Sequence, residues 1–154
     1  MRSRLRNDAN QFLAGTIAAN GGTELPGRNV VFRAGTLLVW QDSGNFIRLD
    51  RGGLFKNGQT ASTAYFHVFK NDKRVVEQAP VIKDEPTYLH LERKGDIIKA
   101  YARQGESKRT FPPQKTTLPA KVQIALGAVN ASTKPLEIEF SEFSITKPAP
   151  GKKE

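Results

Sequence analysis

Cysteine is absent from the 154 residues of the sequence. A disulfide framework and a thiolate metal site are therefore excluded, while the redox compartment stays open because a chain without thiols is stable in either. No apolar run reaches the ~18 residues of a membrane-spanning helix. The basic N-terminus "MRSRLRNDANQF" is not followed by the apolar core of a signal peptide. Localisation is left unknown, since Met1 is either a true start or the first residue of a fragment of a larger surface or cytoplasmic protein.

Acidic residues are the scarcer charge, because 15 Asp and Glu face 24 Lys and Arg for a formal net charge of +9. Such an excess is typical of proteins that bind polyanions. The basic residues are nevertheless scattered over the termini and the predicted turns in short groups such as "RSRLR", "KNDKR" and "GKKE", without one dense run. This distribution indicates a generally basic surface and argues against nucleic acid as a partner.

Helical spacing of apolar residues is missing as well, and short runs with period-two alternation take its place. About nine such runs are separated by Gly, Pro, Asn and Asp, namely Gln11–Ala19, Ala34–Gln41, Asn45–Gly52, Ser62–Lys70, Val75–Ala79, Thr87–Lys94, Ile97–Gln104, Lys121–Val129 and Leu136–Thr146. Short strands with one buried face each predict an antiparallel all-β sandwich or barrel. We expect a single domain over residues 1–147 and a solvated basic tail over residues 148–154.

The apolar positions of these runs predict the core. Alternation assigns to it Leu37, Val39, Ile47, Leu49, Phe66, Val68, Leu89, Leu91, Val122, Ile124, Leu126, Ile138 and Phe140.

Four stretches occur together in a familiar order: "AGTLLVWQDSGNFIRLDRGG", "YLHLERKGDIIKAYARQGES", "PAKVQIALGAVNAS" and "LEIEFSEFSI". From about Ser3 to Thr146 the chain resembles a bacterial family of unknown function, sometimes labelled regulation of enolase, in the concanavalin A-like lectin/glucanase superfamily. The resemblance implies a jelly-roll sandwich of two curved antiparallel sheets, of the kind commonly appended to glycan-active enzymes, kinases or surface proteins.

The sequence departs from this family at one turn. Family members often continue the second hairpin as Ser-x-Asp-Gly followed by Trp, whereas here the turn is "RQGE" and no Trp follows. Phe111 is the candidate for the packing role of that Trp. Ligand contacts that depend on the missing Asp or Trp are not expected in this chain.

The sharpest catalytic pattern is "EIEFSE", from Glu137 to Glu142. Laminarinase-type glycoside hydrolases of the same superfold carry a Glu-x-Asp-x-x-Glu strand, and a retaining mechanism needs two carboxyl groups ~5 Å apart. A bulge near Ser141 could bring Glu137 and Glu142 to one face. Three features argue against catalysis: the middle acid is Glu139 where an Asp is required, the strand is the last of the chain, and no Trp flanks it. We therefore expect a non-enzymatic domain with a solvated edge strand here.

Metal binding has little support in the sequence. His67 and His90 are the only histidines, and Glu92 is the only obvious additional ligand, whereas zinc requires three or four. The "DSGN" and "NDK" loops could offer oxygens to calcium but lack the carboxylate density of a dedicated site. No cofactor is predicted, and half-exposed histidines on a sheet face are the expected state.

The residues that alternate with the core give the candidate binding surface: Phe46, Arg48, Asp50, His67, Phe69, His90, Glu92 and Tyr101, with Trp40 as an uncertain member. Aromatic rings stack on the C–H patches of sugars, and charged side chains hydrogen-bond to hydroxyls. If these strands are neighbours in one curved sheet, the residues line its concave side.

Trp40 depends on the hairpin turn at "DSG". A two-residue turn at Ser43 and Gly44 would pair it with Ile47 and bury it, whereas a three-residue turn would pair it with Phe46 and expose it on the ligand face. The prediction for the whole chain is a binding or accessory module with carbohydrate as the leading ligand, or alternatively a structural or protein-docking domain of a larger bacterial protein. Arg48, Asp50, His90 and Glu92 would hydrogen-bond the ligand.

Overall fold

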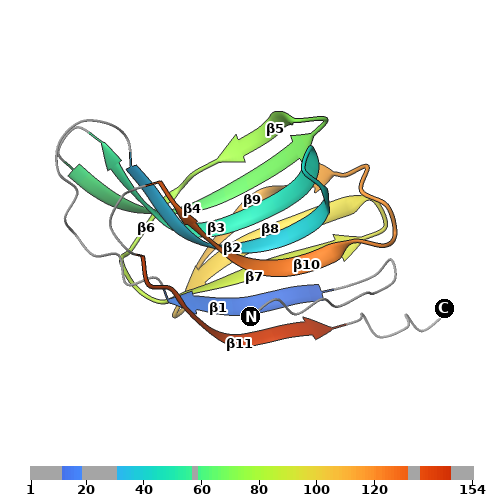
Figure 1. The fold of residues 1–154 in the computed structure, drawn as a ribbon. Helices are drawn as coiled ribbons and strands as arrows, with labels where there is room; N and C mark the ends of the chain where they lie inside the picture. The colour runs from blue at the N-terminus through green and yellow to red at the C-terminus, as the bar shows by residue number, and fades with distance from the viewer. Residues whose placement is uncertain (1–11, 19–30, 57–58, 132–135, 147–154) are drawn as a thin grey trace.

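The structure is a computed structural model that describes residues 12–18, 31–56, 59–131 and 136–146. Within these residues the chain forms eleven strands and no helix (Figure 1). The strands are β1 (Phe12–Ala18), β2 (Val31–Asp42), β3 (Asn45–Lys56), β4 (Gln59–Lys70), β5 (Lys73–Gln78), β6 (Val81–Ile82), β7 (Thr87–Lys94), β8 (Ile97–Gln104), β9 (Ser107–Lys115), β10 (Gln123–Asn130) and β11 (Glu139–Thr146). The predicted tail over residues 148–154 lies outside the described residues.

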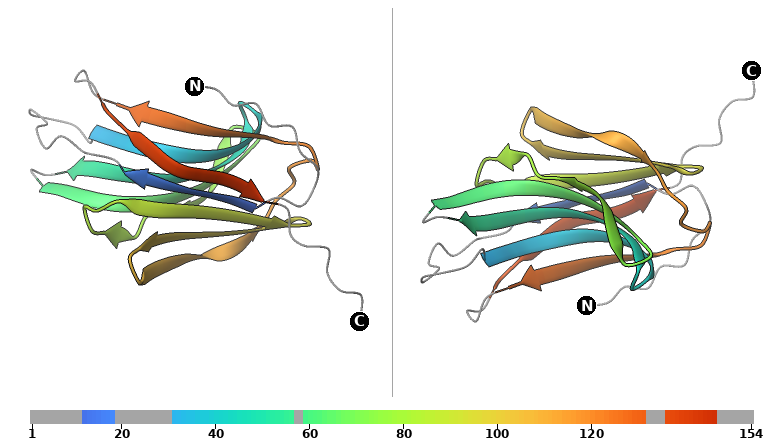
Figure 2. Two further views of the ribbon diagram at one scale, coloured as in Figure 1. Left: turned by 90° about the horizontal axis from the view of Figure 1, so that it is seen from below. Right: turned by 90° about the horizontal axis from the view of Figure 1, so that it is seen from above.

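Two antiparallel sheets form the fold. One has the strand order β11-β1-β7-β8-β9, and the other has the order β10-β2-β3-β4-β5 with β6 paired to β4. The sheets stack face to face as two layers, which the views along the sandwich show most plainly (Figure 2). The predicted all-β sandwich of two antiparallel sheets is confirmed, because alternating strands of this length bury one face each only by packing two sheets together.

The core lies between the sheets and contains the residues that alternation assigns to it. Nine of the thirteen predicted core residues are buried, and the other four, Val122, Leu126, Ile138 and Phe140, are partly buried against them. Leu126 and Phe140 belong to β10 and β11, which are edge strands and therefore have a neighbour on one side only. Phe111 from β9 is 2% exposed and meets Phe66 from β4 at a ring-centroid distance of 5.4 Å. It fills the interior, as the packing role predicted for it requires.

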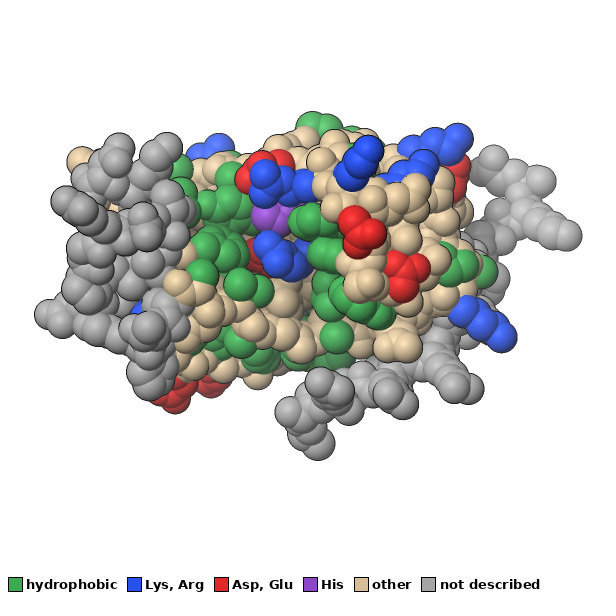
Figure 3. Space-filling view, turned by 45° about the horizontal axis from the view of Figure 1, so that its top comes forward, with side chains coloured by type: hydrophobic (Ala, Val, Ile, Leu, Met, Phe, Trp, Pro, Cys, Tyr) green, Lys and Arg blue, Asp and Glu red, His purple; other side chains and the backbone are tan. Residues whose placement is uncertain are grey.

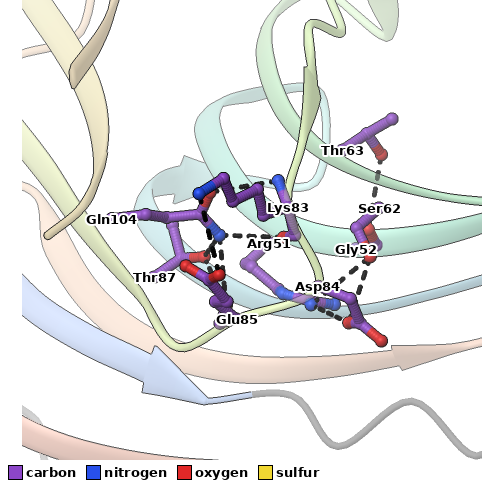
Figure 4. A network of polar contacts seen from close by, with 9 residues as sticks. All are labelled: Arg51, Gly52, Ser62, Thr63, Lys83, Asp84, Glu85, Thr87 and Gln104. Atoms are coloured by element: carbon purple, nitrogen blue, oxygen red, sulfur yellow. Dashed lines mark hydrogen bonds and ion pairs between the residues drawn. The ribbon is translucent and has the colours of Figure 1, made fainter. Parts of the chain in front are cut away.

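One end of the sandwich contains a buried cation, Arg51. Arg51, only 2% exposed, forms an ion pair with Asp84 in the loop after β6, and the Ser62 hydroxyl donates to the same carboxylate at 3.1 Å (Figure 4). The hydrogen bond from Arg51 holds the pKa of Asp84 below its usual value. A charge this deep is tolerated only when it is paired in this way.

Gln104 at the end of β8 fixes the same loop to the other sheet. Its amide nitrogen lies 2.8 Å from the Lys83 carbonyl, 3.2 Å from the Glu85 carbonyl and 2.9 Å from the Thr87 hydroxyl (Figure 4). The Lys83 amide in turn donates to the side-chain oxygen of Gln104 at 3.1 Å. The loop between β6 and β7 therefore ties the two sheets together beside the Arg51–Asp84 pair.

Replacing Phe111 with Ala should lower the free energy of unfolding by about 3–5 kcal/mol, because it leaves a cavity against Phe66 at the centre of the sandwich. Urea denaturation monitored by circular dichroism measures the change. Val75→Ala on β5, where the side chain is 56% exposed, is the control and should stay within about 0.5 kcal/mol of the parent. A similar loss in both variants would contradict the packing role of Phe111.

Candidate functional site

The register of the β2–β3 hairpin decides which residues face outward. The turn itself has two residues, Ser43 and Gly44, but the pairing shifts by one residue between Trp40 and Asp42. Trp40 therefore lies opposite Phe46, the exposed alternative of the two considered from the sequence. A β-bulge changes the side-chain register without lengthening the turn, which is why turn length alone did not decide it.

Asp42 holds this turn in place. Its carboxylate accepts hydrogen bonds from the Gly44 amide at 2.9 Å and from the Asn45 side chain at 2.9 Å. The neighbouring β4–β5 turn is joined to it, because the Asp72 amide donates to the Gly44 carbonyl at 3.0 Å. A Cβ on Gly44 would lie 2.9 Å from the Asp72 carboxylate and 3.0 Å from the Asp72 amide nitrogen, so glycine lets the two turns approach this closely without displacing Asp72.

Outward side chains of β10, β2, β3, β4 and β5 form what we call the concave face, since these strands bend so that both their ends rise away from the other sheet (Figure 1). Three half-buried aromatic residues stand in a row across it. The rings of Trp40 and Phe46 are 5.3 Å apart at 25°, and those of Phe46 and Phe69 are 4.3 Å apart at 16°. Rings lying flat side by side could not come this close, so Phe46 and Phe69 stand on edge with their faces in contact.

The β10 strand next to Trp40 carries small outward side chains. Ala125 lies opposite Leu38, Gly127 lies opposite Thr36, and the exposed Gln123 lies opposite Trp40 itself. A Cβ on Gly127 would meet the Thr36 methyl group at 3.0 Å. We call Ala125 and Gly127, together with the exposed Gln123, the β10 shelf.

Arg48 occupies the next row of the concave face and is held from two sides. Its Nε lies 2.8 Å from Asp50 Oδ2, and its Nη2 lies 3.1 Å from His67 Nδ1. An arginine nitrogen always donates, so His67 Nδ1 must be the acceptor and the ring is the neutral tautomer with hydrogen on Nε2. Glu77 faces that nitrogen at 3.9 Å. Two of the guanidinium nitrogens are thus fixed on the protein.

Burial changes the proton affinities of both partners of Arg48. Asp50 is completely buried, and burial raises the pKa of its carboxyl to about 6, although Arg48 and the Thr36 hydroxyl act in the opposite direction. Burial also lowers the pKa of His67 to about 4, with a further lowering by the charges of Arg48 and Arg74. His67 is therefore neutral at pH 7, and Asp50 is an ionised carboxylate beneath the guanidinium.

The concave face carries no uncompensated charge among its described residues. Arg48 pairs with Asp50, and Arg74 pairs with Glu77 at 2.8 Å. A view from this side of the sandwich shows hydrophobic side chains gathered around a histidine, with basic and acidic groups close together (Figure 3). The net charge of +9 therefore lies elsewhere on the chain.

The nine residues of the candidate binding surface do not all share one face. Trp40, Phe46, Arg48, Asp50, His67 and Phe69 lie on the concave face, whereas His90, Glu92 and Tyr101 lie on the outward side of β7 and β8 in the other sheet. The expected common surface requires all these strands to be neighbours in one sheet, and this expectation is wrong, because β7 and β8 belong to the other sheet. Which strands become neighbours depends on long-range pairing. The two groups are on opposite sides of the sandwich.

The expectation of half-exposed histidines is wrong, because His67 and His90 are only 4% and 9% exposed. Asp50 is fully buried, so Asp50 and His67 contact Arg48 and offer almost no surface of their own. Sequence reasoning missed the β10 shelf and Leu38 because small and apolar side chains carry no chemical signal of their own. Their alternation with Val39, Ile124 and Leu126 is the pattern that would have placed them outward.

Glu137 and Glu142 both lie exposed on or beside the edge strand β11. Glu137 precedes β11, Glu142 lies at an irregularity of that edge strand with a φ of 55°, and both side chains are exposed. The bulge near Ser141 that the sequence allowed is present, where the β1–β11 pairing shifts. Within the described ranges no group of three or more His, Asp or Glu residues could hold a metal ion, and no helix has the length and hydropathy needed to span a bilayer.

Comparison with known proteins identifies the fold. No protein-family model matches the chain, and no curated protein matches it either. A protein of unknown function from Saccharomyces cerevisiae has a similar structure, with a TM-score of 0.71, 12% identity, and coverage of 96% of this chain and 74% of that one. The carbohydrate-binding module CBM66 from Bacillus subtilis gives a TM-score of 0.56 at 15% identity, with coverage of 92% and 76%.

A larger protein contains the same fold as one part. The xylan β-1,4-xylosidase from Bacillus halodurans matches with a TM-score of 0.68 and 9% identity over 96% of this chain but only 30% of its own. At these identities the likeness shows the sandwich fold alone. The finer resemblance to the regulation-of-enolase-type family stays a prediction.

The buried groups around Arg48 predict an unusual pH dependence of stability. Because the folded-state pKa of Asp50 lies above its ordinary value of 3.8, its contribution to stability falls by up to ~3 kcal/mol as pH rises from about 4 to 6. Because the folded-state pKa of His67 lies below its ordinary value of 6.5, its contribution rises by a similar amount between about pH 4 and 6.5. The two slopes oppose each other in the parent protein.

Single substitutions should separate them. In Asp50→Asn the free energy of unfolding should rise more steeply with pH across this window than in the parent, because only the His67 term is left. In His67→Gln it should fall with pH relative to the parent. Urea titrations between about pH 4 and 7 measure both, and equal slopes in the parent and the two variants would refute the assignment.

Proposed function

We propose that this domain is a non-catalytic binding module that holds a neutral saccharide on its concave face. The observation that carries the proposal is that Trp40 lies directly beside the β10 shelf, and that the guanidinium of Arg48 lies in the adjacent row of side chains. Protein sites for sugars combine a flat aromatic ring with a few fixed hydrogen-bonding groups. These residue types are present here within neighbouring strands.

Trp40 is the residue we assign to stacking. Phe46 cannot take this role, because one of its faces contacts Phe69 and the other is turned to Trp40. The indole face of Trp40 directed to β10 is the one available to a sugar ring lying over Ala125 and Gly127. Phe46 and Phe69 support the indole from behind and keep it upright.

Arg48 and Gln123 are the hydrogen-bonding groups of the proposed site. Asp50 and His67 fix Nε and Nη2 of Arg48, so Nη1 is the nitrogen we assign to a ligand hydroxyl. A guanidinium held in this way loses little conformational entropy on binding. The exposed amide of Gln123 offers both a donor and an acceptor beside the indole ring.

Charge balance supports a neutral ligand over an acidic one. Both cations of the concave face already have a carboxylate partner, so the negative charges of Asp50 and Glu77 offset the attraction of the two arginines for an anionic sugar. Hydroxyl groups face no such penalty. The likeness in fold to a carbohydrate-binding module and to part of a xylosidase agrees with this class of ligand.

A structural or protein-docking domain is the second candidate. The observation in its favour is that the similar part of the xylosidase is less than a third of that chain. A docking domain would also be one part of a larger protein. A docking surface would use the row of Trp40, Phe46 and Phe69 as one apolar strip. Saccharide binding would instead require Trp40 and Arg48 together.

Trp40→Ala should weaken binding of a neutral glycan by tenfold or more, because it removes the flat ring assigned to stacking beside the β10 shelf. A glycan array identifies the ligand, and titration calorimetry then measures the dissociation constant. Tyr88→Ala, which removes an aromatic ring from the other sheet, is the matched control and should leave affinity unchanged.

The polar half of the site is tested by removing Arg48 and Asp50 together. Arg48→Gln with Asp50→Asn avoids leaving a buried charge without its partner, so the fold should survive. This double variant should also lose neutral-glycan binding. If no neutral glycan binds the parent protein at physiological salt, the docking alternative replaces the saccharide proposal.

A further inference from the structure

Sheet β11-β1-β7-β8-β9 carries a second cluster of rings on its outward side. We call Tyr88, His90, Tyr101, Arg103 and Lys108 the opposite face, since it lies on the far side of the sandwich from the concave face. The rings of His90 and Tyr101 stack at 4.4 Å and 17°, and Tyr88 lies 6.1 Å from Tyr101 and 6.4 Å from His90. The three rings form one continuous cluster on two strands, in which His90 and Tyr101 are stacked face to face, and we call this cluster the platform.

Two exposed cations lie on this platform. The Lys108 ammonium is 3.9 Å from the ring centre of Tyr101, and the Arg103 guanidinium is 5.0 Å from that of Tyr88. Cation–π contacts of this kind hold a long side chain in place without neutralising its charge. Within the part of the chain that the structure describes, neither cation forms an ion pair with a carboxylate.

The two cations are also direct cross-strand neighbours. Arg103 on β8 lies opposite Lys108 on β9, and like charges at such positions destabilise a sheet. Two rows along on the same side, the sheet places Glu92 opposite Lys99, which is the favourable arrangement. A bound anion between Arg103 and Lys108 would remove the repulsion that the protein alone leaves in place.

The charge of this surface does not depend on histidine ionisation. Burial lowers the pKa of His90, Lys108 lowers it further, and only Glu92 acts to raise it. His90 therefore contributes a neutral ring near pH 7. Burial likewise raises the pKa of Tyr101, which keeps the phenol protonated as a hydrogen-bond donor. The opposite face thus offers two cations and phenol groups to a ligand. Glu92 is the acidic residue whose charge acts on His90.

We infer that the opposite face is a second binding site, for the sulfate or carboxylate groups of a linear acidic polysaccharide, and that it acts independently of the concave face. Oxyanions match the ammonium, the guanidinium and the phenol hydroxyls that gather there. A nucleic acid is the less suitable polyanion, because single-stranded binding relies on bases stacking on rings, and here Lys108 and Arg103 occupy positions over two of them.

The test compares four polymers on the full chain: dextran sulfate, polygalacturonate, unmodified dextran and a single-stranded oligodeoxynucleotide. Arg103→Gln with Lys108→Gln removes two charges from the opposite face and should weaken binding of dextran sulfate or polygalacturonate about tenfold or more. The stronger of these two arms identifies sulfate or carboxylate as the preferred group. Arg103→Lys keeps the charge and should retain most of the affinity.

Lys73→Gln with Lys115→Gln is the matched control. It removes the same charge from two exposed residues, one on β5 in the other sheet and one at the far end of β9 from Lys108, and it should change affinity by less than twofold. Equal losses in the two double variants would overturn the proposal, because they would assign binding to the overall charge of +9. Absence of binding to both acidic polysaccharides, or tighter binding of the oligonucleotide through the same residues, would overturn it too.

Failure of this proposal is distinct from failure of the first. Trp40→Ala removes a concave-face ring and should leave dextran sulfate and polygalacturonate binding unchanged. A loss of acidic-polysaccharide binding in Trp40→Ala would show that one site serves both ligands and would contradict the independence of the two faces.

Discussion

The β-bulge between Trp40 and Asp42 is the constraint on which the concave face depends. A strand has a side-chain period of two, so a pairing shift of one residue exchanges the core set and the outward set over its whole length. The bulge, held by the Asp42 carboxylate on the Gly44 amide, puts Leu37 and Val39 inside and Trp40 outside while the turn itself stays short. Gly44 and Asp72 then join this turn to the next hairpin, so the row of Trp40, Phe46 and Phe69 is anchored at its rim.

Asp50 is the second element of that architecture and the one that lowers stability at neutral pH. A fully buried carboxylate with a raised pKa is less stable ionised than it would be in water, and its attraction to Arg48 does not fully offset the loss of hydration. An apolar residue would pack at this position with less penalty. The gain is in geometry, since Asp50 and His67 fix two of the guanidinium nitrogens of Arg48 and leave this long side chain little freedom.

Alternation along single strands was enough to predict the fold class and most of the core. Leu37, Ile47, Phe66 and Leu89 are buried as their spacing requires, because burial of one strand face is a local property of the sequence. Which strands are neighbours is not local. His90 and Arg48 each alternate with buried residues on either side along their strands, yet β7 and β3 belong to different sheets. Burial of a polar outward residue such as Asp50 was equally invisible, because it depends on the neighbouring strands that cover it.

The two faces of the sandwich differ in how their cations are treated, and this difference argues against one shared ligand. On the concave face each arginine has a carboxylate within 2.8 Å. A ligand there meets paired charges that largely cancel, and no net positive charge. On the opposite face Arg103 and Lys108 rest on tyrosine rings, and an aromatic ring attracts a cation without cancelling its charge. Under the two proposals, a ligand selected by hydroxyl geometry and a ligand selected by negative charge would therefore meet different sides of the same sheet pair. Arg103 and Lys108 are the part of the basic excess that bears on the second surface.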